Sequence, residues 1–62
     1  MNKYLYEIWF RYGEFEKDFE HVEIEATSLA EATLAAKDYH RWVFKITLLE
    51  INGKKVEIDN VN

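Results

Sequence analysis

The chain has no cysteine, no proline and only two glycines among its 62 residues. Without cysteine no disulfide can form, and two histidines supply too few ligands for a structural zinc site. No apolar run approaches the roughly 20 residues of a membrane span, and residues 1–7 lack the apolar stretch of a signal peptide. We therefore expect one small soluble domain, residues 1–62, in the cytoplasm, with no metal or other cofactor.

Hydrophobic residues, by contrast, make up 48% of the chain, and 16% of its residues are aromatic. A domain this small buries only about 60% of the surface that its unfolded chain exposes. Without disulfides or a metal, such a domain needs good packing or a contribution from a second copy or another protein. The aromatic residues are therefore candidates for both the core and a contact surface.

Residues 3–12, KYLYEIWFRY, are rich in aromatic and β-branched types and predict a strand. Alternation places Tyr4, Tyr6, Ile8, Phe10 and Tyr12 on one face, and Leu5, Glu7, Trp9 and Arg11 on the other. Gly13 then allows a turn, with a positive φ if the turn needs one. A second, largely polar strand is expected over residues 18–26, at an edge of the sheet. Its inward residues are Val22, Ile24 and Ala26, and its outward residues are Phe19, His21, Glu23 and Glu25.

A helix is expected next, because Ser28 and Glu31 have the spacing of a capping box. The alanine-rich run 29–39 continues it. At a period of 3.6 residues, one side of this helix gathers Leu29, Ala32, Ala35, Ala36 and Tyr39. Since this stripe is mostly alanine, the helix can lie close to a sheet whose strands supply the large side chains.

Residues 41–51, RWVFKITLLEI, predict a third strand that is apolar on both faces. The expected faces are Trp42, Phe44, Ile46 and Leu48 on one side, and Val43, Thr47, Leu49 and Ile51 on the other. Asn52 and Gly53 then favour a type I′ hairpin turn. A short, charged fourth strand is expected over 54–58, and residues 60–62 are expected to fray.

Together these elements predict an α+β fold of the order hairpin, helix, hairpin (ββαββ), with a mainly antiparallel four-stranded sheet and one helix packed on one face. Two sheet orders are compatible with the pattern. The order 2-1-3-4 places the two apolar strands inside and is favoured for that reason. The β-grasp order, 2-1-4-3, would instead place the short charged strand inside the sheet.

The net charge of −4 is concentrated in residues 1–27, which carry seven acids and three bases. Four acids of the first hairpin recur at every second position: Glu14, Glu16, Asp18 and Glu20. If the strands extend through them, they form a row with a spacing of about 6.6 to 6.8 Å. Such a row resembles the phosphates of a nucleic acid and would fit a Lys/Arg-lined groove of a partner. The alternative is a solvated edge whose charges prevent strand pairing, and nothing indicates an acid–base pair of an enzyme.

The sheet face that one helix leaves uncovered is the second candidate site, because it would carry Leu5 and Trp9. An open apolar face is typical of dimerisation or partner binding. The alternative is that the stems of Arg11 and Lys45 cover these residues. Direct nucleic-acid binding is not expected, because Glu7, Glu50 and the acidic hairpin would repel phosphate.

The run YEIWFRYGEFEKDFEHVEIEATSLAEATLAAKDYH, and within it residues 25–32, resembles short acidic phage-encoded inhibitors of bacterial defence, such as anti-CRISPR proteins. The resemblance implies a non-enzymatic protein that binds a host nuclease or defence complex. In that hypothesis the four acids of the hairpin make electrostatic contacts, and Trp9 or Phe15 is an aromatic anchor. The competing hypothesis is a structural homo-oligomer, such as a homodimer, that assembles through the open sheet face.

Overall fold

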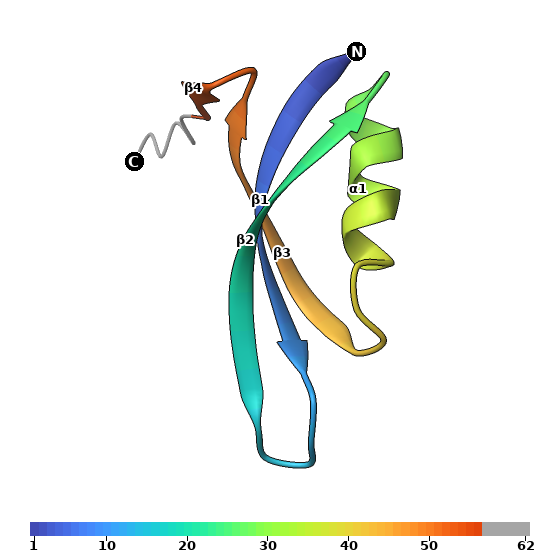
Figure 1. The fold of residues 1–62 in the computed structure, drawn as a ribbon, viewed down its shortest axis with the longest axis vertical. Helices are drawn as coiled ribbons and strands as arrows, with labels where there is room; N and C mark the ends of the chain where they lie inside the picture. The colour runs from blue at the N-terminus through green and yellow to red at the C-terminus, as the bar shows by residue number, and fades with distance from the viewer. Residues whose placement is uncertain (57–62) are drawn as a thin grey trace, which may run out of the picture.

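The computed structural model describes residues 1–56 and shows a four-stranded antiparallel sheet with one helix (Figure 1). The elements are β1 (Asn2–Arg11), β2 (Lys17–Ala26), α1 (Leu29–Lys37), β3 (Val43–Ile51) and β4 (Lys54–Lys55). The strands lie in the order β2-β1-β3-β4, so β1 and β3 are the inner strands. The predicted α+β class is thereby confirmed. The predicted end of the fourth strand at residue 58 and the predicted fraying of 60–62 lie outside the described residues.

β1 is the centre of the fold and supplies most of its core. It pairs with β2 along its whole length, from Asn2 opposite Ala26 to Arg11 opposite Lys17. The buried side chains of β1 are Tyr4, Tyr6, Ile8 and Phe10, as the alternation predicts. Tyr12 was expected on the same face, but β1 ends at Arg11 and the Tyr12 side chain is exposed.

α1 covers the face of the sheet that carries the buried tyrosines. Its N-terminus is capped as predicted, because the Glu31 amide donates to Ser28 Oγ at 3.2 Å. The Glu31 carboxylate, however, accepts a hydrogen bond from Thr27 Oγ1 at 2.7 Å, so it does not complete the expected capping box with Ser28. On the sheet side, the hydroxyls of Tyr6 and Thr33 are hydrogen-bonded at 2.9 Å.

The buried stripe of α1 is narrower than predicted. Only Ala32 and Ala36 are buried, while Leu29 and Tyr39 are exposed. The helix ends at Lys37 with Asp38 as its C-cap, so Tyr39 lies beyond it. Since only two methyl groups of the helix are buried against the sheet, the large side chains of β1 fill the core. Within residues 1–56, no helix is long and apolar enough to cross a membrane.

β3 departs from simple alternation, and the predicted assignment of its faces is right for Ile46 and Leu48, which share one face, but wrong at the two ends of the strand. Against β1, it contains an extra residue at two places, where the pairing passes from Leu5 to Tyr6 and from Trp9 to Phe10. Each extra residue reverses the faces of the residues that follow. The side chains of β3 that pack against the core are therefore Val43, Ile46, Leu48 and Ile51, whereas Phe44 is exposed.

The Asn52-Gly53 turn joins β3 to β4 as predicted. Both residues have positive φ, 52° and 80°, as a type I′ turn requires. Asn52 also connects the turn to the start of β1 by two hydrogen bonds. Its backbone amide donates to the Lys3 carbonyl at 2.7 Å, and its side-chain Oδ1 accepts from the Lys3 backbone amide at 2.9 Å. The turn therefore holds β3 in register with β1.

Candidate interaction surface

The sheet face opposite α1 carries three aromatic side chains, which we call the aromatic cluster: Trp9, Phe19 and Phe44. Trp9 and Phe19 are directly opposed on β1 and β2, and their ring centroids lie 4.7 Å apart. The ring of Phe44 on β3 lies 6.5 Å from that of Trp9. At these distances aromatic rings attract each other. Phe19 is 44% exposed and Phe44 is 47% exposed, so the cluster is open to solvent.

Glu7 and His21 fix the position of the Trp9 indole. Trp9 Nε1 donates to Glu7 Oε1 at 2.6 Å, and the other carboxylate oxygen of Glu7 lies 3.2 Å from His21 Nε2. The hydrogen bond from Trp9, and secondarily that from His21, lowers the pKa of Glu7 below its ordinary value. A charged carboxylate therefore orients the Trp9 indole, which the rings of Phe19 and Phe44 contact.

Charged residues divide this open face into two halves. The basic half lies next to the loop between β1 and β2 and contains Arg11, Lys17 and Lys45. The acidic half lies toward the other end and contains Glu23, Glu25 and Glu50, together with one base, Lys3. The aromatic cluster lies within the basic half, where the Arg11 guanidinium carbon is 5.4 Å from the centroid of the Phe44 ring. The open face therefore has opposite charge at its two ends.

The four acids predicted as a row do not lie along one strand. β2 begins at Lys17, so Glu14 and Glu16 belong to the loop of residues 12–16 and only Asp18 and Glu20 alternate along a strand. The Glu16 carboxylate lies over Gly13, where a β-carbon would collide with it. Gly13 does not have the positive φ that was considered for the turn, so the turn does not depend on the conformational freedom of glycine at this position.

These acids are nevertheless exposed, and they differ in their contacts. Glu20 accepts a hydrogen bond from the Tyr39 hydroxyl at 2.9 Å, and this bond is the main reason why the pKa of Tyr39 is raised. Asp18 accepts from the amide of Phe19 at 2.8 Å. Within residues 1–56, the only ion pair closer than 4 Å joins Glu7 to His21. Glu14, Glu16 and Asp18 thus present charge that no base in this part of the chain pairs with.

The two predicted aromatic anchors have different surroundings. Trp9 is the centre of the aromatic cluster, whereas Phe15 lies in the loop between β1 and β2 and is 85% exposed. Sequence reasoning did not select Phe19 or Phe44. Phe19 could have been found by counting back from a hairpin loop of five residues, which sets it opposite Trp9. Phe44 could not, because an irregularity of β3 decides its face.

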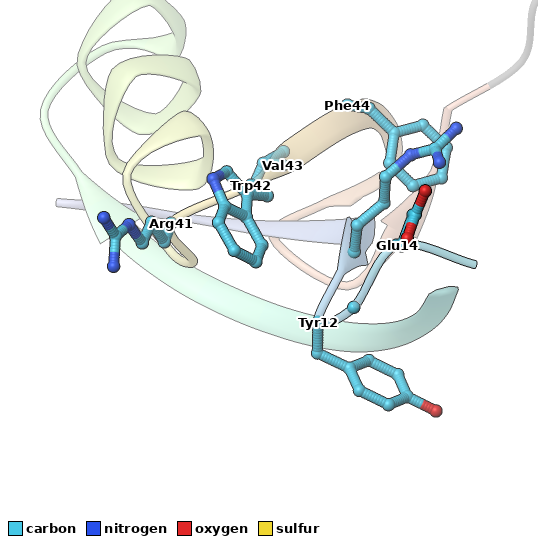
Figure 2. A pocket seen from close by; sticks show the side chains of 8 residues that line it. Tyr12, Glu14, Arg41, Trp42, Val43 and Phe44 are labelled. Carbon is cyan, nitrogen blue, oxygen red and sulfur yellow. The ribbon is translucent and has the colours of Figure 1, made fainter. Parts of the chain in front are cut away.

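A hollow of about 720 Å³ lies beside the aromatic cluster, between the start of β3 and the first hairpin loop (Figure 2). Its lining includes Arg11, Tyr12, Glu14, Arg41, Trp42 and Phe44. Figure 2 shows Trp42 and Phe44 coming from the β3 side and Tyr12 from the loop. The guanidinium carbon of Arg41 lies 5.4 Å from the Trp42 ring centroid. The open face therefore continues into a hollow that is lined by aromatic side chains and arginines.

Within the part of the chain that the structure describes, no group of three or more His, Asp or Glu residues is placed to hold a metal ion. Comparison of the chain with protein-family models, with curated proteins and with solved structures gives no match. The chemistry of the open face must therefore be judged from its own residues.

Proposed function

We propose that this protein is a non-enzymatic protein-binding module whose contact surface is the open face of the sheet. The observation that supports this most strongly is the aromatic cluster, because it is exposed and yet held in place by hydrogen bonds and ring contacts. Preorganised aromatic side chains contribute much of the binding energy at protein interfaces. A surface with these properties is suited to another protein rather than to water.

A second copy of the chain is the partner that the charges of this face favour. If two open faces meet about a two-fold axis that runs across the strands, the basic half of each copy lies against the acidic half of the other. Arg11 and Lys45 would then approach Glu23 and Glu50 of the second copy. A face with one sign of charge would repel its own copy, whereas this face attracts it.

The size of the face indicates how strong such a dimer would be. Three strands of about ten residues make a face of about 500 Å² at normal strand spacing. Two copies would bury about 1,000 Å² in total, which is at the low end for specific interfaces. We therefore expect a weak dimer, with a dissociation constant on the order of 100 μM.

Replacement of Phe19 by serine tests this proposal, with the same replacement at Phe15 as its control. Both phenylalanines are exposed, but only Phe19 belongs to the aromatic cluster. In sedimentation equilibrium up to millimolar protein, the unchanged chain and Phe15→Ser should dimerise, while Phe19→Ser should do so at least about tenfold more weakly. A chain that stays monomeric at millimolar concentration, or equal effects of the two replacements, would contradict the proposal.

A second function, inhibition of a host nuclease or defence complex in the manner of a phage protein, uses the hairpin instead of the face. The observation that favours it is the unpaired charge of Glu14, Glu16 and Asp18, which could contact a basic groove of such a complex. Dimerisation is compatible with it, since each copy would present its own hairpin.

A phage-plating assay tests the inhibitor function. In bacteria whose CRISPR-type nuclease restricts a phage, expression of the protein should restore plating, and the double replacement of Glu14 and Glu16 by serine should reduce that effect at least about tenfold. Serine at Glu31 and Asp38, which are exposed and lie outside both the hairpin and the open face, removes the same charge elsewhere and should have no effect. No restoration by the unchanged chain, or equal loss with both pairs, would exclude the hairpin as the inhibitory site.

A further inference from the structure

The side chains of the open face form rows that run across the strands, and one row lies at the centre of the face. His21 on β2, Glu7 on β1 and Thr47 on β3 are directly opposed in this central row. The row that contains Trp9 lies on one side of it, and the row that contains Leu5 lies on the other. The central row therefore separates the basic half of the face from the acidic half.

In the dimer proposed above, the two-fold axis would run along this central row. Rotation about such an axis exchanges the rows on its two sides, so Trp9 would pack against Leu5 of the second copy, and Lys45 would lie opposite Glu50. The central row would meet its own copy, because it lies on the axis. Since stacked sheets pack about 10 Å apart, the two Glu7 carboxylates would come together between the sheets.

Glu7 and His21 form a pair whose charge depends on the proton of the imidazole. His21 Nε2 lies 3.2 Å from Glu7 Oε2, and the two side chains are 51% and 27% exposed, so water reaches both in the single chain. The hydrogen bond from Trp9, and then that from His21, lowers the pKa of Glu7, so this carboxylate keeps its charge in mild acid. A neutral imidazole leaves that charge uncompensated, whereas a protonated imidazole neutralises it.

Few other charged groups face His21. Glu23 follows it on the same side of β2, and Lys45 on β3 acts on Glu7 from the far side of β1. Within residues 1–56, β2 is an edge strand, and α1 packs on the opposite face of the sheet. A second copy would add its own Glu7 and His21 to the centre. With both imidazoles neutral, this centre would carry two negative charges, and with both protonated it would carry none.

We infer that dimerisation through the open face depends on pH and that protonation of His21 strengthens the dimer. The inference rests on the proposed function, because it assigns a regulation to the same face. Placing two carboxylates between the sheets costs free energy, since each loses water and repels the other. A proton on each His21 offsets this cost, so association takes up protons and is favoured in mild acid.

Sedimentation equilibrium of the full chain tests the inference at about pH 8 and about pH 5.5, which span the range where histidine gains its proton. Both values lie above the isoelectric point of about 5.0, so the chain keeps a net negative charge. At equal ionic strength, the dissociation constant should be at least about tenfold lower at the acid pH. Circular dichroism at both pH values establishes that each variant is folded.

Matched replacements of the two histidines of the chain identify the group that takes up the proton. His21→Gln keeps an N–H for Glu7 but gains no charge, so its dissociation constant should change less than about threefold between the two pH values. His40→Asn keeps an acceptor for the Trp42 amide, which donates to His40 Nδ1 at 3.3 Å. This second variant should retain the full pH dependence of the unchanged chain.

Glu7→Gln tests the carboxylate itself. Glutamine keeps an acceptor for the Trp9 indole but removes the negative charge from the centre of the interface. Its dimer should therefore be stronger than that of the unchanged chain at the higher pH. In acid it should become weaker instead of stronger, because the protonated imidazoles would then lack a counter-charge. A role of Glu7 limited to positioning Trp9 would not reverse the pH dependence.

The results that would overturn the inference differ from those that would contradict the dimer. Equal dissociation constants at the two pH values, or a weaker dimer in acid, would overturn the inference and leave the dimer in place. Loss of the pH dependence in His40→Asn but not in His21→Gln would assign the proton to the wrong histidine for this inference. A chain that is monomeric at millimolar concentration at both pH values would contradict the dimer and the inference together.

Discussion

Glu7 has the most specific role of any single residue on the open face, because one carboxylate holds both Trp9 and His21. If the hydrogen bond from the indole is the main cause of its lowered pKa, Trp9→Phe should raise the pKa of Glu7 toward its ordinary value. Phenylalanine keeps an aromatic ring but has no N–H to donate. A carboxyl ¹³C NMR titration measures this pKa directly.

The same titration predicts how stability depends on pH. The pKa of Glu7 is lower in the folded chain than in the unfolded chain, so its contribution to stability is complete above the ordinary pKa that the group has in the unfolded chain. That contribution is lost as the pH falls from the unfolded-state pKa of Glu7 through its folded-state pKa. Over this pH range the Trp9→Phe variant should lose less stability than the unchanged chain. Phe44→Leu is the control, since it alters the cluster but not the donor. An unchanged Glu7 pKa in Trp9→Phe would contradict this explanation.

Single residues were predicted well where simple alternation applies and poorly where loops intervene. The alternation of β1 correctly separated Tyr6 and Ile8 from Trp9. The row of acids was less accurate, because its regular spacing assumed strand geometry through residues that form a loop. Contacts between distant residues, such as that of Glu7 with His21, depend on a hairpin register that spacing alone does not fix.

At the scale of elements, the narrow contact between α1 and the sheet controls how close the two layers lie. Ala36 is fully buried and Ala35, its neighbour, is exposed. Ala36→Leu should therefore destabilise the fold by about 1–3 kcal/mol through overpacking. Ala35→Leu should change the free energy of unfolding by less than about 0.5 kcal/mol. Urea denaturation followed by circular dichroism measures both, and equal effects would mean that α1 does not pack through Ala36.

The elements themselves follow closely from local sequence signals. Ser28 marks the start of α1, and Asn52 with Gly53 marks the turn after β3. The length of α1 was overestimated, because the helical period was extended to Tyr39, whereas the helix ends at Lys37 with Asp38 as its C-cap. The faces of β3 were assigned correctly in its middle but wrongly at its two ends, since two irregularities arise from its pairing with β1 rather than from its own sequence. Local signals therefore locate elements better than they orient them.

At the scale of the whole molecule, one helix on a four-stranded sheet leaves the other face of the sheet uncovered within residues 1–56. The net charge of −4 does not reveal how charge is distributed on the open face, which has a basic half and an acidic half. A dimer formed by opposite halves should weaken as salt increases, since exposed charges are screened over about 8 Å at physiological ionic strength. The available surfaces and their charge pattern together support a role in binding other protein chains.

The most direct test of the central claim is a charge-exchange experiment on the open face. Lys17→Glu with Lys45→Glu makes the basic half acidic, and Glu23→Lys with Glu25→Lys makes the acidic half basic. Each double variant should repel its own copy, and an equimolar mixture of the two should associate. Sedimentation velocity at millimolar protein should therefore give the monomer mass for each variant alone and twice that mass for the mixture. A mixture that remains monomeric, while the unchanged chain dimerises, would contradict the proposed arrangement.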